Sequence, residues 1–317
     1  MRSYSLIAPA KINLYLEIVG DRPDGYHELV MILQSIDLAD QVDLHANGTD
    51  AVRVYCEDPL VPLNEQNIAY HAAQLMVEEF PDAFAQYGGV NITINKQIPV
   101  AAGLAGGSTD AAAVLVGIDL MWDLGLTRPE LQDLAAKLGS DVPFCISGGT
   151  AIATGRGEQL DTLVDLNQLS VVLAKHRNLT VSTAWAYQTY RQQFGSSSRT
   201  QVPSGRSLAL EGNSGSQVRA ILQKDGELIG KLLHNDLEKV VLPQFPGVAK
   251  LRAAFERAGV LGTMMSGSGP TVFALCQSED QATEVMQQVK AEIPDPEIDF
   301  WLARLSGSGI QVASSAK

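Results

Sequence analysis

Positive charge is scarce in this sequence. The 317 residues carry 23 Lys and Arg against 36 Asp and Glu, which gives a formal net charge of -13 at pH 7. Nucleic acids and anionic membranes are bound through a basic face, so we expect neither as the main partner. A local basic site for a phosphorylated ligand remains compatible with this balance, because a few cations in a cleft can outweigh the overall field.

Cysteine is also scarce, and the chain has no Cys-x-x-Cys pair. Cys56, Cys145 and Cys276 lie far apart and are odd in number, which argues against a disulfide framework or a zinc site. They are typical of core thiols in a reducing compartment. No signal peptide is recognisable, and no apolar run is long enough to span a bilayer. We therefore expect a cytoplasmic protein.

Glycine, by contrast, is concentrated between a predicted strand and a predicted helix. Residues 99–111 read PVAAGLAGGSTDA, with three glycines in five residues. Residues 90–95 alternate as a strand does, and the apolar run 111–124 is typical of a buried helix. Glycines let a ligand approach the backbone, and the free N–H groups of a helix start attract anions. The stretch therefore predicts a phosphate-binding loop, with Ser108 as the expected helix cap.

The spacing of these glycines narrows the kind of phosphate ligand. A P-loop needs a lysine after its last glycine, whereas Ser108 follows Gly107 here. The G-x-G-x-x-G spacing of dinucleotide-binding folds is absent as well. We therefore expect a phosphate group but not a dinucleotide.

Two charged residues outside the loop are candidates for chemistry. One or two strands are expected over residues 5–19, with an interruption at 8–10. Lys11 and Asn13 lie two apart in this stretch, so both project to one face. Lys11 is either a solvated side chain or a phosphate ligand, and its spacing does not decide between them. Asp141, taken alone, is more often a helix cap than a functional carboxylate.

Two further stretches have an ordinary and a functional interpretation. His27, next to Tyr26, is either a core histidine or a group that hydrogen-bonds a nucleobase. Residues 266–271, SGSGPT, form either a plain turn or a loop that brings backbone N–H groups to a ligand.

Taken together, these stretches resemble the GHMP small-molecule kinases. Residues 8–13 (APAKIN) resemble the first motif of that family, 99–110 the second and 266–271 the third. Residues 22–29 (RPDGYHEL) and 139–144 (GSDVPF) narrow the resemblance to kinases that act on a cytidine diphosphate-linked methylerythritol. The resemblance runs from about residue 5 to residue 305, and five motifs in the same order make it specific.

The resemblance implies an α+β, two-domain GHMP kinase fold with the active site in the cleft between the domains. Residues 1–165 would form an N-terminal α/β domain like domain 2 of ribosomal protein S5. Residues 166–305 would form a ferredoxin-like α+β domain. Within it, the Ser- and Gly-rich stretch 196–216 is expected to be a mobile insertion. Residues 306–317 are expected to be a loose tail.

The resemblance also implies an activity and its residues. The enzyme would phosphorylate the 2-hydroxyl of its substrate with ATP, aided by Mg²⁺, in the non-mevalonate isoprenoid route. Lys11 and Asp141 would be catalytic. ATP would be bound by Gly103, Leu104, Ala105, Gly106, Gly107, Ser108 and Thr109, with Asn67 and Lys96 near its nucleoside. The second substrate would be bound by Asn13, Tyr26, His27 and Tyr187, with Trp185 the alternative to Tyr187. No residue is assigned as a metal ligand.

Two other functions are compatible with parts of the pattern. Another GHMP kinase, acting on homoserine, a mevalonate-pathway compound or a sugar, would have no base to stack on Tyr26. A non-catalytic nucleotide-binding protein would need neither Lys11 nor Asp141. We expect small-molecule partners, and a monomer or weak dimer.

Overall fold

Two long strands form the centre of the fold. The computed structural model describes residues 2–195 and 212–313. Strands β1 (Ser3–Asp21) and β2 (His27–Ala46) pair antiparallel along their length. Their register shifts between Pro9 and Lys11, so the interruption expected at 8–10 is a bulge within one strand. A bulge is where a sheet tolerates proline, and it also changes the direction of nearby side chains.

The other strands in the described part of the chain join this pair in one mixed sheet. The order along its main path is β12-β1-β2-β11-β7-β10-β9, and β3, β4, β5, β6 and β8 pair at its sides. Their bounds are β3 (Arg53–Cys56), β4 (Val90–Asn95), β5 (Thr150–Gly155), β6 (Gln159–Thr162), β7 (Ser170–His176), β8 (His234–Asn235), β9 (Gly262–Met265), β10 (Val272–Cys276), β11 (Ile298–Ser306) and β12 (Gln311–Val312).

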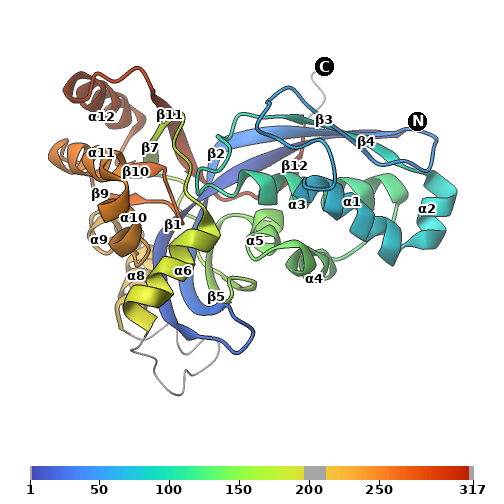
Figure 1. Ribbon diagram of the computed structural model, residues 1–317, viewed down its shortest axis with the longest axis horizontal. Coiled ribbons are helices and arrows are strands. Elements are labelled where there is room, and N and C mark those ends of the chain that lie inside the picture. Colours follow the sequence, from blue (N-terminus) through green and yellow to red (C-terminus); the bar gives the residue numbers. More distant parts are fainter. Residues whose placement is uncertain (1, 196–211, 314–317) are drawn as a thin grey trace.

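One group of helices packs under the half of the sheet that holds β3 and β4 (Figure 1). It comprises α1 (Ile68–Glu79), α2 (Pro81–Tyr87), α3 (Gly106–Trp122), α4 (Arg128–Leu138) and α5 (Val142–Ser147). Local signals explain several of their ends. The Thr127 side chain accepts from Glu130 N while the Glu130 carboxylate accepts from Thr127 N, a complete capping box at α4.

A second group gathers at the opposite end of the molecule, around β7, β9 and β10 (Figure 1). It comprises α6 (Thr183–Phe194), α8 (Gly212–Leu222), α9 (Gly226–Lys231), α10 (Glu238–Gln244), α11 (Pro246–Arg257) and α12 (Glu279–Glu292). Ser182 caps α6 by accepting from Trp185 N. No helix in residues 2–195 and 212–313 is both long and apolar enough to cross a membrane.

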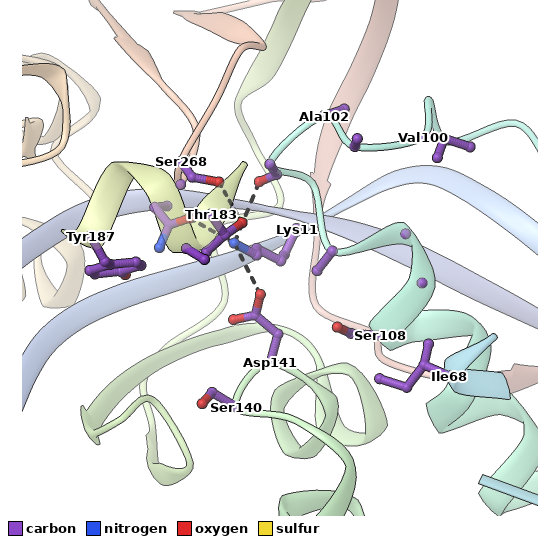
Figure 2. A pocket seen from close by; sticks show the side chains of 18 of the residues that line it. Lys11, Ile68, Val100, Ala102, Ser108, Ser140, Asp141, Thr183, Tyr187 and Ser268 are labelled. Atoms are coloured by element: carbon purple, nitrogen blue, oxygen red, sulfur yellow. Dashed lines mark hydrogen bonds and ion pairs between the residues drawn. The ribbon is translucent and has the colours of Figure 1, made fainter. Parts of the chain in front are cut away.

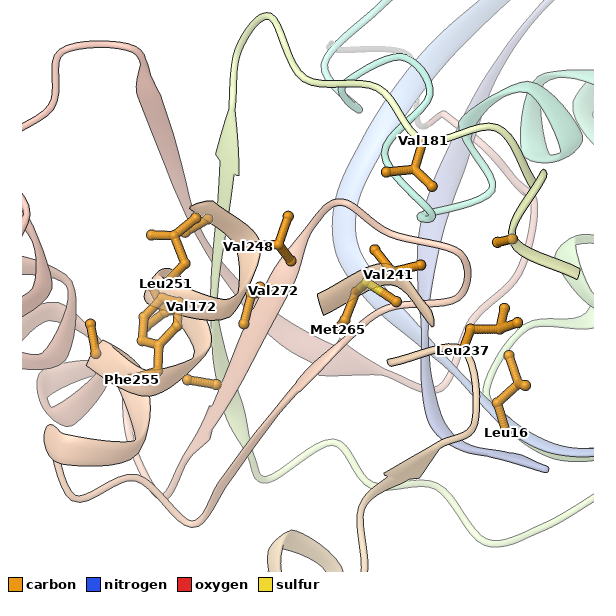
Figure 3. Packing of buried hydrophobic residues seen from close by; sticks show 14 of the residues in the cluster. Leu16, Val172, Val181, Leu237, Val241, Val248, Leu251, Phe255, Met265 and Val272 are labelled. Carbon is orange, nitrogen blue, oxygen red and sulfur yellow. The ribbon is translucent and has the colours of Figure 1, made fainter. Parts of the chain in front are cut away.

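The buried side chains do not separate at the domain boundary expected near residue 165. Figure 3 shows Leu16 of β1 beside Leu237, in the cluster that also contains Val241 and Met265. Leu33 and Phe144 belong to the same cluster, so both parts of the chain share one apolar contact region. The boundary itself stays a prediction.

Two segments differ from expectation. Residues 196–211 of the predicted insertion lie outside the described residues, but 212–216 begin α8, with Ser214 and Gly215 buried. The stretch expected to be a loose tail is ordered as far as residue 313: Ser306 ends β11, and β12 pairs with β1. Its polar composition suggested a free end, but backbone pairing with the edge of β1 needs no apolar side chains.

The ordered tail packs its backbone against α5. Ile310 N donates to Cys145 O at 3.2 Å. A Cβ on Gly309 would overlap the carbonyl oxygen of Ile146 and lie 2.7 Å from that of Cys145. Only glycine therefore fits at this position, directly behind the helix that follows Asp141.

We expect Gly309→Val to destabilise the protein by about 1–3 kcal/mol, because an added side chain must push the tail away from α5. Urea unfolding measures this. The matched control is Gln311→Val, which is exposed in β12 and should change stability by less than about 0.5 kcal/mol. Equal stability of the two variants would mean that the tail does not support α5.

Candidate active site

A cavity of about 920 Å³ collects most of the residues predicted from the sequence. They come from segments that are far apart in the chain. The predicted residues that line it are Lys11, Asn13, Tyr26, His27, Asn67, Lys96, Gly103, Ala105, Gly106, Gly107, Ser108, Asp141 and Tyr187. Leu104 and Thr109 are buried and do not line it, and their contact with ATP stays a prediction.

The glycine loop passes directly into α3. Ala105 is the N-cap, in the left-handed conformation at φ +59°, and the helix begins at Gly106. The prediction that Ser108 caps the helix was therefore wrong. Gly, Ser and Thr have low helix propensity, which placed the predicted start too late. The backbone N–H groups of residues 106–108 precede the first intrahelical bond, from Thr109 N to Ala105 O, and can meet an anion.

Lys11 lies at the centre of the cavity wall (Figure 2). Its buried ammonium group donates to Asn13 Oδ1 at 2.8 Å and lies 3.6 Å from Asp141 Oδ2. Lys11 and Asn13 thus share a face, as predicted. Asp141 is the residue before α5, but its side chain makes no capping hydrogen bond. Its carboxylate, about one-third exposed at 31%, faces Lys11 and the cavity instead.

The loop formed by residues 266–268 is hydrogen-bonded to the glycine loop. Ser266 Oγ donates to Gly103 O at 3.0 Å, and the Lys11 ammonium lies 3.5 Å from the same oxygen. Asn235 holds the 266–268 loop from behind by donating to Gly267 O at 2.8 Å. Ser268 and Thr183 hydroxyls are 2.9 Å apart at the cavity edge (Figure 2). Three separate motifs therefore meet around one carbonyl group.

Lys96 lines the cavity, but its charge is already neutralised. Its ammonium group donates to Asp110 Oδ2 at 2.8 Å and to Asp40. Burial favours a lower pKa for Lys96, but the two carboxylates outweigh it and raise the pKa. Burial also raises the pKa of Asp110. Asp40 belongs to β2, which is far from the glycine loop in the sequence. No local pattern therefore predicts the cluster of Lys96, Asp40 and Asp110.

The other end of the cavity is aromatic. The Tyr26 ring is half exposed, at 54%, and Arg156 lies 4.9 Å above its centre. The rings of His27 and Tyr187 are stacked at 5.5 Å, and His27 Nε2 lies 3.3 Å from Tyr187 O. Burial, together with the Arg191 charge, lowers the pKa of His27.

The choice between Tyr187 and Trp185 follows from their surroundings. Trp185 packs edge-on against Phe245, with centroids 5.5 Å apart, and both contact the buried cluster that contains Leu237 and Val241. Tyr187 lines the cavity and Trp185 does not. Sequence reasoning missed Arg156 and Thr183. Arg156 stands in a Gly-Arg-Gly turn, whose composition suggested only a turn.

Two family models match the chain. The model described as the GHMP kinases N terminal domain matches residues 67–149, and the model described as GHMP kinases C terminal matches residues 217–295. Curated relatives named 4-diphosphocytidyl-2-C-methyl-D-erythritol kinase are similar along their whole length. The relative from Nostoc punctiforme is 62% identical over 99% of this chain and 100% of its own. That from Gloeothece citriformis is 61% identical over 98% and 99%. The chain belongs to the GHMP kinases.

Solved structures agree on the fold. This GHMP kinase matches the crystal structure of a 4-(cytidine 5'-diphospho)-2C-methyl-D-erythritol kinase at 30% identity and a TM-score of 0.72, over 96% of this chain and 100% of that one. It matches a homoserine kinase from Cytophaga hutchinsonii at 21% identity and a TM-score of 0.76, over 99% and 98%. The second likeness concerns the fold alone. As a kinase of this family, the protein takes its phosphoryl group from ATP.

Gly103 is the glycine of the loop that the structure constrains most. It has φ +75°, and a Cβ would overlap Ser266 O, whereas a Cβ on Gly107 would meet only Ile68 Cγ2, at 3.4 Å. We expect Gly103→Ala to lower the melting temperature clearly and Gly107→Ala to leave it unchanged or slightly raised. Thermal unfolding of both variants checks this. Equal melting temperatures would mean that the two loops are not locked together here.

Proposed function

We propose that this GHMP kinase transfers the γ-phosphoryl group of ATP to the 2-hydroxyl of 4-diphosphocytidyl-2-C-methyl-D-erythritol, a step of the non-mevalonate isoprenoid route. One observation carries the proposal: a single cavity holds an open helix start, a Lys–Asp pair and an aromatic end. The names of relatives at about 60% identity support the same substrate.

The end of the cavity beside α3 suits ATP. Its walls include apolar side chains that can contact the adenine, namely Leu60, Val61, Pro62, Ile68 and Val100. The first turn of α3 offers backbone N–H groups and the positive end of the helix dipole to the phosphates. This arrangement needs no lysine in the loop itself, which explains how the chain binds phosphate without a P-loop.

The aromatic end suits the cytidine moiety. Tyr26 offers an exposed ring, and Tyr187 offers a second ring in the same cavity. Base–aromatic stacking contributes about 1–3 kcal/mol per base. His27 lines the same end of the cavity, and its ring would exchange one of its contacts, with Tyr187 O or with Asp21, to hydrogen-bond the edge of the base. Arg156, which lies over Tyr26 and lines the cavity, carries a charge that can attract the diphosphate.

The Lys–Asp pair suits proton transfer from the acceptor alcohol. A tertiary hydroxyl is a poor nucleophile at neutral pH, so its proton must be accepted as the oxygen attacks. In the proposed step Asp141 takes this proton, the O–P bond to the γ-phosphorus forms, and the bond to the ADP oxygen breaks. Lys11 stabilises the negative charge that develops on the attacking oxygen, and Asn13 holds the Lys11 ammonium group in place.

The residues present fit a weakly held Mg²⁺ rather than a protein-built metal centre. No group of three or more His, Cys, Asp or Glu in the described residues could hold a metal ion. Mg²⁺ in kinases is held largely by substrate phosphates and water. The Ser108 hydroxyl, which lines the cavity in the first turn of α3, is the side-chain ligand we assign to it. When bound, Mg²⁺ would neutralise phosphate charge.

The two alternative functions are separated by a substrate panel. A homoserine kinase shares the fold at a TM-score of 0.76, so the fold does not distinguish substrates. ATP consumption with the cytidine substrate, homoserine, mevalonate and galactose does. Turnover of the cytidine substrate alone is the expected result, while turnover of another acceptor, or of none, would contradict the proposal. Action in the cytoplasm and a monomeric or weakly dimeric state stay predictions.

We expect Asp141→Asn to lower kcat about 10²–10⁴-fold, because an amide cannot accept the hydroxyl proton. Both substrates should still bind, since the amide keeps the shape of the carboxylate. Single-turnover phosphorylation measures the effect, alongside Lys11→Ala and the double variant. The two single losses should be far from additive, because Lys11 and Asp141 are 3.6 Å apart. Near wild-type turnover in Asp141→Asn would rule Asp141 out as the base.

We expect Tyr26→Ala to weaken binding of the cytidine substrate by about 1–3 kcal/mol and to leave ATP binding unchanged. Calorimetric titration with each ligand measures both. Tyr26 is exposed, so its removal should not change stability. If both ligands lose affinity equally, Tyr26 does not serve the cytidine end.

A further inference from the structure

Tyr26 has an exposed ring, and the Arg156 guanidinium lies 4.9 Å from the ring centre. Tyr26 stands at the end of the turn 22–26 between β1 and β2, and this turn is built from local contacts. Arg22 N donates to Tyr26 O at 2.9 Å, and Tyr26 N donates to Asp24 Oδ1 at 3.1 Å. A turn held only by itself would leave the position of the ring free relative to the rest of the cavity.

One side chain from α6 connects this turn to the body of the protein. Arg191 Nη2 donates to the carbonyl oxygens of Gly25 and Tyr26, at 2.9 and 3.1 Å. Arg191 Nε donates to Asp21 Oδ1 at 2.9 Å. The same carboxylate oxygen lies 3.0 Å from His27 Nδ1. Arg191 therefore contacts the turn, the end of β1 and, through Asp21, the start of β2.

Arg191 also lies four residues after Tyr187 on α6. Side chains at this spacing share one face of a helix, so α6 presents Tyr187 and Arg191 to the same side. Tyr187 is one aromatic wall of the cavity, and Arg191 binds the backbone of the other wall, Tyr26. Arg191 thus ties the backbone of one wall to the helix that carries the other, in addition to the contact between His27 and Tyr187.

We propose that Arg191 is a positioning residue that fixes the spacing of the two aromatic rings for a cytosine base. This inference rests on the function proposed above. Arg191 acts through the backbone of Tyr26, whereas Tyr26 and Tyr187 touch the base. Its planar group is suited to the task because it reaches three acceptors at once, which the single ammonium of a lysine does less well.

The test compares Arg191→Met and Arg191→Lys with wild type, using the full chain. Calorimetry with CDP and with ADP reads the two ends of the cavity separately, and kinetics give KM and kcat. We expect Arg191→Met to weaken CDP binding and to raise the KM of the cytidine substrate about 10- to 100-fold, the range for lost charged hydrogen bonds. ADP binding and kcat should change less than about threefold, and Arg191→Lys should fall in between.

The matched control is Arg177→Met. Arg177 directly follows β7 and makes a similar ion pair, at 2.7 Å, with Asp299 of β11. Neither residue lines the cavity. Arg177→Met should leave both affinities unchanged. A second comparison tests the route of action: in the Tyr26→Ala background, Arg191→Met should weaken CDP binding little further, because the ring it positions is gone.

Three results would overturn the inference. Unchanged CDP binding in Arg191→Met, together with weaker CDP binding in Tyr26→Ala, would overturn the inference but leave the proposed function intact. Equal loss of CDP and ADP affinity with a lower melting temperature would reduce Arg191 to a general structural role. Full additivity with Tyr26→Ala would show that it acts elsewhere. If wild type binds CDP but does not turn over the cytidine substrate, the proposed function fails, and the CDP comparison still decides the role of Arg191.

Discussion

The carbonyl oxygen of Gly103 is the point on which the site depends. It accepts a hydrogen bond from Ser266 and lies beside the Lys11 ammonium, so the glycine loop, the 266–268 loop and β1 are joined at one atom. Because Gly103 has no side chain, the backbone of residue 266 can approach this closely. The contact sets where Lys11 stands and leaves the start of α3 open to the cavity.

In this acidic protein, the attraction for an anion depends on which Lys and Arg side chains are not fully paired with carboxylates. Lys96 is neutralised by Asp40 and Asp110, and Arg191 is paired with Asp21. Lys11 faces a single carboxylate at 3.6 Å, and Arg156 lies 4.0 Å from Glu158. In the proposed function, the attraction for phosphate comes from Lys11, Arg156 and the first turn of α3, at short range inside the cavity. This explains how a chain of net charge -13 can bind anionic substrates.

The fold is shared with solved structures of kinases that are named for other acceptors. A homoserine kinase has the same architecture at 21% identity. In this chain the turn between β1 and β2 carries Tyr26, and α6 carries Tyr187. Both side chains line the cavity of this chain, on elements separate from the glycine loop.

The sequence alone determined what depends on neighbours along the chain. The alternation over residues 90–95 predicts β4, and the caps of α4 and α6 at Thr127 and Ser182 use contacts within three residues of the chain. It also predicted that Lys11 and Asn13 share a face, since that follows from strand geometry. The motif residues could be named because each motif is short and contiguous.

Only the tertiary structure decided what depends on distant partners. Helix α3 starts at Gly106 despite poor propensity, β12 pairs with β1 despite a polar sequence, and Lys96 is neutralised by Asp40 from another strand. The side chain of Asp141 does not cap α5. It pairs with Lys11, 130 residues away in the chain, because α5 packs beside β1. Such pairings have no local signature, because their energy comes from groups that meet only when the chain has folded.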